Sequence, residues 1–313
     1  MVRRVVCREF ADPERFELVE EPTPEPGPGE VLVAVEAAAV SFVDGLIARG
    51  DYQLRPPLPF TPGSAIAGTT PDGRRVAALL TGFGGFASHA VVPEGLLVPV
   101  PDEVDAGVAA SSLESHGTIA FAFRDRVTVR PGEWVVVLGA SGGIGQAAVD
   151  HARAAGARVL AVASTPDKRA AALEAGAEVA VGYDSLKDTI RGHTGGGADV
   201  VIDPVGGDAA EAALRALAAG GRFCVLGFTS GTIPKLPANL VLLRNRTVVG
   251  VDWGDWSRTD PAASRDLAED VLRRIGSGEL HPARPRTLSL DDAATATRAY
   301  AERSAVGKLV LTP

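Results

Sequence analysis

The sequence predicts an α/β fold in which a doubly wound parallel sheet follows a β-rich first part. Two observations carry this prediction. The middle of the chain alternates apolar strands with helices, and a glycine-rich turn joins the first of these strands to its helix. The first part of the chain instead carries short strand patterns separated by proline and glycine.

The composition is that of a packed globular protein with an excess of acidic residues. Hydrophobic residues make up 46% of the 313 residues and charged residues 22%, which suits two modest domains or one large one. The net charge of −8 argues against a nucleic-acid partner or an acidic membrane surface. No apolar run reaches the ~20 residues of a membrane span, and the opening MVRRVVCREF lacks the apolar run of a signal peptide. We therefore expect a cytoplasmic protein without membrane partners.

Alternating residues predict the strands of the first part. Val31, Val33 and Val35 alternate with other residues, as in a strand with one buried face. Further short strands are predicted at Arg75–Leu80 and Ser88–Pro93. Because proline and glycine recur between the strands, we expect a small barrel or sandwich.

Strands buried on both faces predict a parallel sheet in the middle of the chain. Trp134–Leu138 is a continuous apolar run, and Arg158–Val162 follows a helix that ends at Gly156. Pro166 suits the first position of the next helix. The remaining predicted elements are strands at Val179–Val181, Asp199–Ile202, Arg222–Leu226 and Thr247–Val251, helices at about Pro261–Ile275 and Leu290–Arg303, and a closing strand at Lys308–Leu311.

The glycine-rich turn Gly139–Gly145 is the strongest local signal of function. It follows a strand and opens a helix. Glycines let the backbone approach a pyrophosphate, and the start of the helix offers free N–H groups and a partial positive charge. A tight turn without a ligand is the alternative. Because strands and helices flank the turn on both sides, we expect it to bind a dinucleotide.

The end of the second strand of the parallel sheet favours NADPH over NADH. An NAD site usually has Asp or Glu there to bind the ribose hydroxyls, whereas this chain has Ala163 and Ser164. Ser164 can donate a hydrogen bond, and Lys168 or Arg169 can meet a doubly charged 2′-phosphate. The alternative is that Lys168 and Arg169 are solvated residues of the first helical turn.

Several stretches together resemble the zinc-free quinone oxidoreductases of the medium-chain dehydrogenase/reductase superfamily. Each stretch is weak alone, but they follow the family's order along nearly the whole chain. They are Val40–Asp44, Arg49–Tyr52, Pro59–Gly63, Ala140–Gly145, Asp203–Gly207, Val249–Gly254 and Gly307–Leu311. The resemblance implies a Rossmann domain, residues 116–252, inserted into a GroES-like catalytic domain formed by residues 1–115 and 253–313.

The resemblance also implies that NADPH lies in the cleft between these domains. The residues expected under its pyrophosphate are Gly142, Gly143 and Ile144, with Ser141 in the same turn. Those expected around its 2′-phosphate are Ser164, Lys168 and Tyr183. Those expected near its nicotinamide half are Thr118, Phe228 and Trp253. The substrate pocket is expected to be lined by Ser41 and Tyr52, which are the candidate catalytic residues.

Two positions depart from the pattern of this family. The family usually has Asn where this chain has Ser41, and Glu where it has Ala65. Serine is shorter than asparagine, and the loss of the Glu removes a carboxylate that can organise the pocket. Both changes bear on the identity of the substrate more than on the cofactor.

The cysteines and histidines predict no metal site. Cys7 and Cys224 are far apart in the sequence and are expected to be reduced core thiols, while His89 and His116 are isolated. Zinc enzymes of the superfamily need Cys, His and carboxylate ligands in the cleft. Without a Lewis acid, alcohol oxidation is disfavoured, and reduction of an electrophilic acceptor is favoured.

We therefore expect hydride transfer from NADPH to a quinone or an α,β-unsaturated carbonyl compound, with Ser41, Tyr52 or backbone N–H groups binding the acceptor oxygen. One alternative is an enoyl reductase that acts on a thioester or a specialised metabolite. Another is a regulatory protein that binds NADPH without turnover. The resemblance also implies a homodimer paired through Thr247–Val251, unless that strand is internal.

Overall fold

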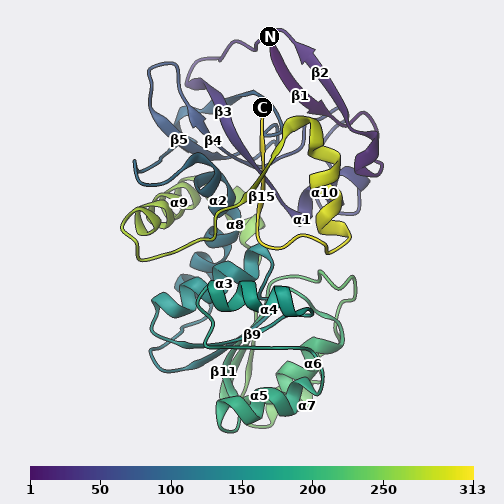
Figure 1. The fold of residues 1–313 in the computed structure, drawn as a ribbon, viewed down its shortest axis with the longest axis vertical. Coiled ribbons are helices and arrows are strands. Elements are labelled where there is room, and N and C mark those ends of the chain that lie inside the picture. The colour runs from purple at the N-terminus through teal and green to yellow at the C-terminus, as the bar shows by residue number, and fades with distance from the viewer. The chain divides into compact units, whose positions relative to one another are not determined.

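The computed structural model describes residues 1–313, which form two compact units (Figure 1). The terminal unit comprises Met1–Glu114, Ser257–Gly278 and Ala283–Pro313. The middle unit comprises Ser115–Trp256 and Glu279–Pro282. The domain bounds inferred from the sequence remain a proposal beside these compact units.

The middle unit is built on a sheet of six parallel strands, which confirms the doubly wound sheet predicted for this part of the chain. The order β10-β9-β8-β11-β12-β13 reverses direction beside β8, at the point where open α/β sheets bind ligands. The strands are β8 (Trp134–Leu138), β9 (Arg158–Val162), β10 (Val179–Val181), β11 (Ala198–Asp203), β12 (Leu217–Val225) and β13 (Thr247–Gly250).

Helices connect the strands of the middle unit. They are α3 (Gly143–Ala154), α4 (Pro166–Glu174), α5 (Leu186–Thr194), α6 (Gly207–Ala216) and α7 (Ala238–Leu242). Every residue of β8 is buried, as expected for a strand covered on both faces. Pro166 occupies the first position of α4, and α3 ends just before Gly156, as the sequence predicts.

The terminal unit is β-rich and mainly antiparallel. Its larger sheet has the order β14-β15-β3-β4-β5-β7, with β6 also paired to β3. These strands are β3 (Glu30–Val40), β4 (Ala65–Thr69), β5 (Arg75–Leu79), β6 (His89–Pro93), β7 (Val98–Pro99), β14 (Arg286–Ser289) and β15 (Leu309–Thr312). A separate two-stranded sheet pairs β1 (Val2–Val6) with β2 (Glu17–Glu21).

Helices of the terminal unit pack around this sheet. They are α1 (Phe42–Arg49), α9 (Pro261–Gly276) and α10 (Ala293–Ala301), with short 3₁₀ turns at Pro13–Arg15, Glu94–Leu96 and Leu290–Asp292. Two further helices, α2 (Ala106–Phe121) and α8 (Trp253–Thr259), each span a boundary between the units, and a π-helical turn, Ala122–Arg126, follows α2.

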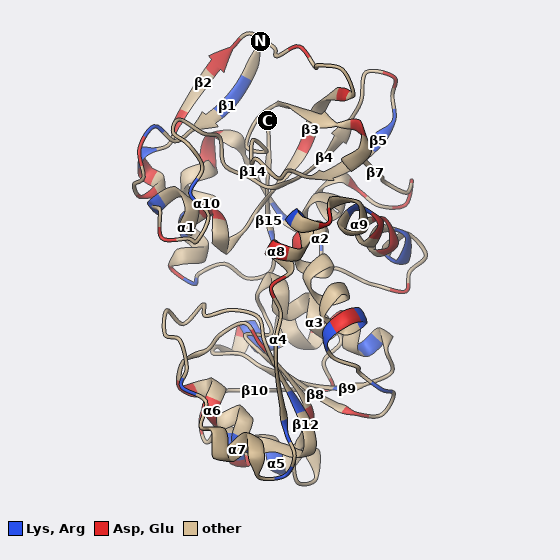
Figure 2. Ribbon diagram, turned by 180° about the vertical axis from the view of Figure 1, so that it is seen from behind, with Lys and Arg blue, Asp and Glu red and all other residues tan.

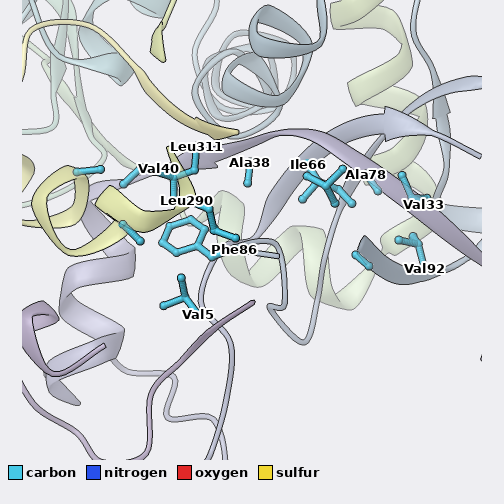
Figure 3. Packing of buried hydrophobic residues seen from close by; sticks show 14 of the residues in the cluster. Val5, Val33, Ala38, Val40, Ile66, Ala78, Phe86, Val92, Leu290 and Leu311 are labelled. Atoms are coloured by element: carbon cyan, nitrogen blue, oxygen red, sulfur yellow. The ribbon is translucent and has the colours of Figure 1, made fainter. Parts of the chain in front are cut away.

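The main core of the terminal unit lies where β3, β4 and β15 meet (Figure 3). Phe86 is fully buried there, with Val40, Leu290 and Leu311 in the same cluster. Burial of such apolar side chains stabilises the fold by roughly 1.5–3 kcal/mol each. This core holds the end of β3, and therefore fixes the start of α1.

Residues of both charge signs occur along α9 (Figure 2). Arg265 pairs with Glu269 at 2.6 Å one turn along this helix. Exposed pairs of this kind add little stability, about 0.3–0.5 kcal/mol each. None of the helices has both the length and the apolar character that crossing a membrane requires.

Candidate functional site

The turn between β8 and α3 has the geometry of a phosphate-binding turn. Gly139 has a φ of 61°, and its carbonyl accepts a hydrogen bond from the N–H of Gly142 at 3.0 Å. A Cβ atom on Gly145 would lie 2.2 Å from the Gly139 carbonyl oxygen. The turn is therefore closed so tightly that only glycine fits at its end, as the sequence motif predicts.

The start of α3 is suited to hold an anion. No side chain caps the helix at Gly142, and its first turn carries no acidic residue. Gly143 and Ile144 are partly exposed there, while Ser141 is buried beneath the turn. Backbone N–H groups and the partial positive charge at a helix start attract a phosphate without further help. These four predicted residues thus lie in one turn.

The predicted 2′-phosphate residues gather at the end of β9. Ser164 is exposed there, and Thr165 caps α4 by accepting the N–H of Lys168 at 3.3 Å. The guanidinium of Arg169 donates to the carbonyls of Ala163 and Ser164, each at 3.3 Å. Arg169 therefore brings a positive charge to this strand end. The sequence alone leaves open whether Lys168 or Arg169 meets the 2′-phosphate.

Tyr183 contacts the phosphate-binding turn. Its hydroxyl accepts a hydrogen bond from the N–H of Gly139 at 3.1 Å. The phenol thus lies against the first residue of the phosphate-binding turn, on the chain segment after β10. Its predicted role at the 2′-phosphate remains a prediction.

Two of the three residues predicted near the nicotinamide lie in neighbouring positions. Thr118 follows Gly117 in α2, and a Cβ on Gly117 would lie 3.4 Å from the ring of Trp253. Phe228 instead lies beside Gly206, with 39% of its surface exposed. Aromatic rings at such places suit an apolar ligand, but the assignments remain predictions.

Asp203 is a buried carboxylate that the sequence offered only as part of a family landmark. It ends β11, and its Oδ1 accepts the N–H groups of Val205 and Gly206 at 2.8 and 2.9 Å. Burial raises the pKa of Asp203, and these two hydrogen bonds oppose the rise. The carboxylate shapes the turn that begins α6, and the sequence gives no local signal for its burial.

The candidate catalytic serine is held by a second missed carboxylate, Asp44. The N–H of Ser41 donates to Asp44 Oδ2 at 2.7 Å, and the Ser41 hydroxyl donates to the same oxygen at 2.9 Å. The N–H of Gly63 donates to Asp44 Oδ1 at 3.2 Å. A Ser-x-x-Asp capping box is a recognisable sequence signal, so this residue could have been found.

Asp44 is almost fully buried, with 2% of its surface exposed. Burial, followed by the nearby Glu114 carboxylate, raises the pKa of Asp44 to about 7, while the Ser41 hydrogen bonds and Lys308 oppose the rise. Tyr52 lies in the same unit, packed against the small apolar cluster that contains Ile47 and Phe60.

Cysteine and histidine side chains form no metal cluster. No three or more His, Cys, Asp and Glu side chains are arranged to hold an ion. Cys7 and Cys224 are buried, and burial raises the pKa of each thiol to about 12.

Two family models match the chain. The alcohol dehydrogenase GroES-like domain matches residues 27–102, and the zinc-binding dehydrogenase model matches residues 143–269. These matches, with the sheets described above, give the terminal unit a GroES-like fold and the middle unit a Rossmann-type fold.

Several known proteins are similar over nearly the whole chain. Quinone oxidoreductase-like protein 2 of Bos taurus is 37% identical, over 99% of this chain and 92% of its own. The quinone oxidoreductase of Thermus thermophilus, solved also in complex with NADPH, is 35% identical with a TM-score of 0.87, over 99% of this chain and 100% of its own. A mycocerosic acid synthase-like polyketide synthase of Mycobacterium tuberculosis is 32% identical over 91% of this chain, but over only 14% of its own length.

Proposed function

Because the chain belongs to the quinone oxidoreductase branch of the medium-chain dehydrogenase/reductase superfamily, we propose that it is a zinc-independent reductase that uses NADPH to reduce a quinone or an α,β-unsaturated carbonyl compound. The oxidoreductase class follows from the family. The cofactor, the acceptor and the absence of zinc from the mechanism are parts of the proposal.

The start of α3 is the observation that carries the cofactor assignment. Its uncapped N–H groups suit a pyrophosphate, and Gly145 keeps the turn closed beneath it. Ser164, Lys168 and Arg169 lie at the strand end where a 2′-phosphate is bound in NADP sites, and no Asp or Glu ends the strand itself to favour NAD. Asp167, in the first turn of α4, is the one carboxylate close to them in the sequence. When bound, NADPH supplies the hydride.

The protein's own task in this reaction is to bind and orient the acceptor and to stabilise the charge that develops on its oxygen. The Ser41 hydroxyl and the Tyr52 phenol are the groups proposed for that oxygen. Zinc independence is supported by the donor set, since no cluster of three or more His, Cys, Asp and Glu side chains could hold an ion. An acceptor with a conjugated carbonyl needs less activation than an alcohol.

Reduction of an enoyl thioester is the second candidate. The similarity to a segment of a protein named a polyketide synthase, rather than a quinone oxidoreductase, favours it. Both candidates use the same cofactor and the same type of hydride transfer, so only the acceptor separates them.

The test is oxidation of NADPH and of NADH by the full chain with a panel of quinones, enones and enoyl thioesters. We expect a preference for NADPH of at least about tenfold in kcat/KM. Turnover of quinones or enones alone would support the first candidate, and turnover of thioesters alone the second. Tight binding of NADPH without any turnover would instead favour a regulatory cofactor-binding protein.

A charge variant tests the cofactor assignment separately. Arg169→Ala should weaken NADPH binding and leave NADH binding nearly unchanged, because only NADPH carries the 2′-phosphate. Lys187→Ala removes an exposed cation on α5 of the same unit and serves as the matched control. Equal losses for both cofactors, or none, would contradict the role of this strand end.

The remaining parts of the proposal concern localisation, oligomeric state and partners. We propose a cytoplasmic homodimer that acts on small molecules and has no nucleic-acid partner. The net charge of −8 supports the last point.

A further inference from the structure

Three ionisable side chains from distant parts of the sequence meet in the terminal unit. Asp44 comes from α1, Glu114 from α2, and Lys308 from the residue before β15. Glu114 Oε2 lies 3.9 Å from Lys308 Nζ, and their side chains are only 18% and 12% exposed. The Ser64 hydroxyl donates to Glu114 Oε1 in a short hydrogen bond. We call Asp44, Glu114 and Lys308 the acid–base cluster.

The acid–base cluster is joined to Ser41 by direct contacts. Asp44 accepts both the N–H and the hydroxyl of Ser41, and Lys308 Nζ donates to the carbonyl of Val40 at 3.2 Å. A capping box explains the N–H contact at the start of α1. It requires neither the burial of Asp44 nor a second carboxylate and a lysine beside it.

The charges of the cluster do not balance when every group is ionised. Two carboxylates would face one ammonium group, which leaves one negative charge in a poorly hydrated place. Burial disfavours that state, and the pKa of Asp44 is accordingly raised to about 7, first by burial and then by Glu114. Asp44 therefore holds its proton to a higher pH than an ordinary aspartate does.

Two other titratable groups face Asp44. Tyr300 of α10 is partly buried, burial raises the pKa of its phenol, and its oxygen accepts the N–H of Leu309 at 3.0 Å. Cys7 lies after β1, and burial and Asp44 raise the pKa of its thiol. Both keep their protons at neutral pH, so Glu114 and Lys308 are the groups that set the charge around Asp44.

We propose that Asp44 and Ser41 form a proton relay for the reduced acceptor, and that Glu114 and Lys308 set its charge. This inference rests on the proposed reductase function. Ser41 suits the relay because a hydroxyl can accept one proton while it donates another, which the amide of the family's usual Asn cannot do. Glu114 gives the cluster a carboxylate in a chain that has Ala65 where the family has Glu.

The relay balances the hydride step. The arriving hydride forms a C–H bond, or an O–H bond in a quinone, and the displaced π electrons become a lone pair on the acceptor oxygen. That oxygen takes the proton of the Ser41 hydroxyl as the Ser41 O–H bond breaks. Ser41 takes the proton of Asp44, and the Asp44 carboxylate is protonated again by solvent. Each turnover therefore consumes NADPH, the acceptor and one proton from solvent.

The sign of the pH dependence follows from the relay. Asp44 must carry a proton to donate it, so kcat should fall as pH rises through the pKa of Asp44. Glu114→Gln removes a negative neighbour and should move this alkaline limb to lower pH by about one unit. Lys308→Met removes a positive neighbour and should move it to higher pH by about one unit.

These opposite shifts are the result that a merely structural role would not produce. Ser41→Ala should lower kcat by about 10²-fold and leave NADPH affinity unchanged. Glu36→Gln is the matched control, because Glu36 also accepts a hydroxyl hydrogen bond, from Thr69, on the exposed surface of the same unit. Thermal melts and NADPH titration of each variant identify any that fails to fold.

A second readout separates this inference from the proposed function. Infrared spectra of wild type and Asp44→Asn, taken across pH, should differ by a protonated carboxyl band that disappears near neutral pH. The band supports the relay's proton store even if no acceptor of the panel is turned over, an outcome that would overturn the reductase function. Absence of the band, or pH limbs that do not shift in opposite directions, would overturn the relay.

Discussion

Gly139 and Gly145 close the phosphate-binding turn from its two ends. Gly139 has positive φ, and a Cβ there would lie 2.9 Å from a methyl group of Val205. At Gly145, a Cβ would meet the Gly139 oxygen at 2.2 Å and the Ala140 Cα at 2.6 Å. Because both contacts of Gly145 are with backbone, the strain cannot be relieved by moving a side chain.

We therefore expect Gly145→Ala to weaken NADPH binding by at least about tenfold, or 1.4 kcal/mol, because the first turn of α3 must shift away from β8. Fluorescence titration with NADPH measures the loss. The matched control is Gly192→Ala, since a Cβ on Gly192 in α5 would contact nothing within 4 Å. That variant should bind NADPH normally and be more stable by up to about 1 kcal/mol. Normal binding by Gly145→Ala would contradict the placement of the cofactor.

Residues that act through local sequence could be predicted, and those that act through tertiary contacts could not. The turn Gly139–Gly145 and the pair of Ser41 and Asp44 are contained in short segments with recognisable spacing. Glu114 and Lys308 act on Asp44 from α2 and from the residue before β15, far from it in the sequence, and each reads alone as an ordinary surface charge. The acid–base cluster therefore has no signal in the sequence.

The connection from α6 to β12 depends on one buried arginine. The guanidinium of Arg246 donates to the carbonyls of Leu240, Ala218 and Arg215 at 3.3, 3.4 and 3.4 Å, and in a shorter hydrogen bond to that of Leu217. It is 8% exposed, and burial lowers its pKa. It thus satisfies carbonyls at the end of α6 that the helix cannot satisfy itself.

Replacing this arginine should destabilise the middle unit. We expect Arg246→Met to lower the free energy of unfolding by about 2–4 kcal/mol, since several buried carbonyls lose their donor. Urea unfolding monitored by circular dichroism measures the change. Arg244→Gln, at an exposed position in the same loop, should change it by less than about 0.5 kcal/mol. Equal effects of the two substitutions would show that the carbonyls find other donors.

The sequence predicts best the elements that have a clear pattern of apolar residues or a clear boundary residue. β8 is a short apolar run, and α4 begins at Pro166. In contrast, the sequence did not indicate α2, because Ser111, Ser112 and Ser115 are buried within it and most of its circumference is covered. A helix covered on most sides has no single apolar face, so its period is weak.

At the scale of the whole molecule, one edge strand of the middle unit's sheet lacks the residues that usually prevent pairing with another chain. β13 is the last strand in the order β10-β9-β8-β11-β12-β13, and it contains no charged residue and no proline. Natural sheet edges usually carry such residues because they prevent pairing with other chains. Exposed apolar side chains also lie in or just before this strand, at Leu242, Leu243 and Val248. A two-fold axis beside β13 would pair two copies and continue the sheet across the dimer.

We accordingly expect the protein to have twice the mass of one chain in solution, as measured by size-exclusion chromatography with light scattering. Val248→Lys should shift it to monomer, because a charge at the centre of the new strand pair would be buried without a partner. Leu18→Lys is the matched control: Leu18 is 39% exposed on β2 of the terminal unit, against 37% for Val248. A wild-type monomer, or a Val248→Lys dimer as stable as the wild type, would contradict pairing through β13. If the monomer keeps full NADPH oxidation, each chain carries a complete site and the dimer serves stability rather than catalysis.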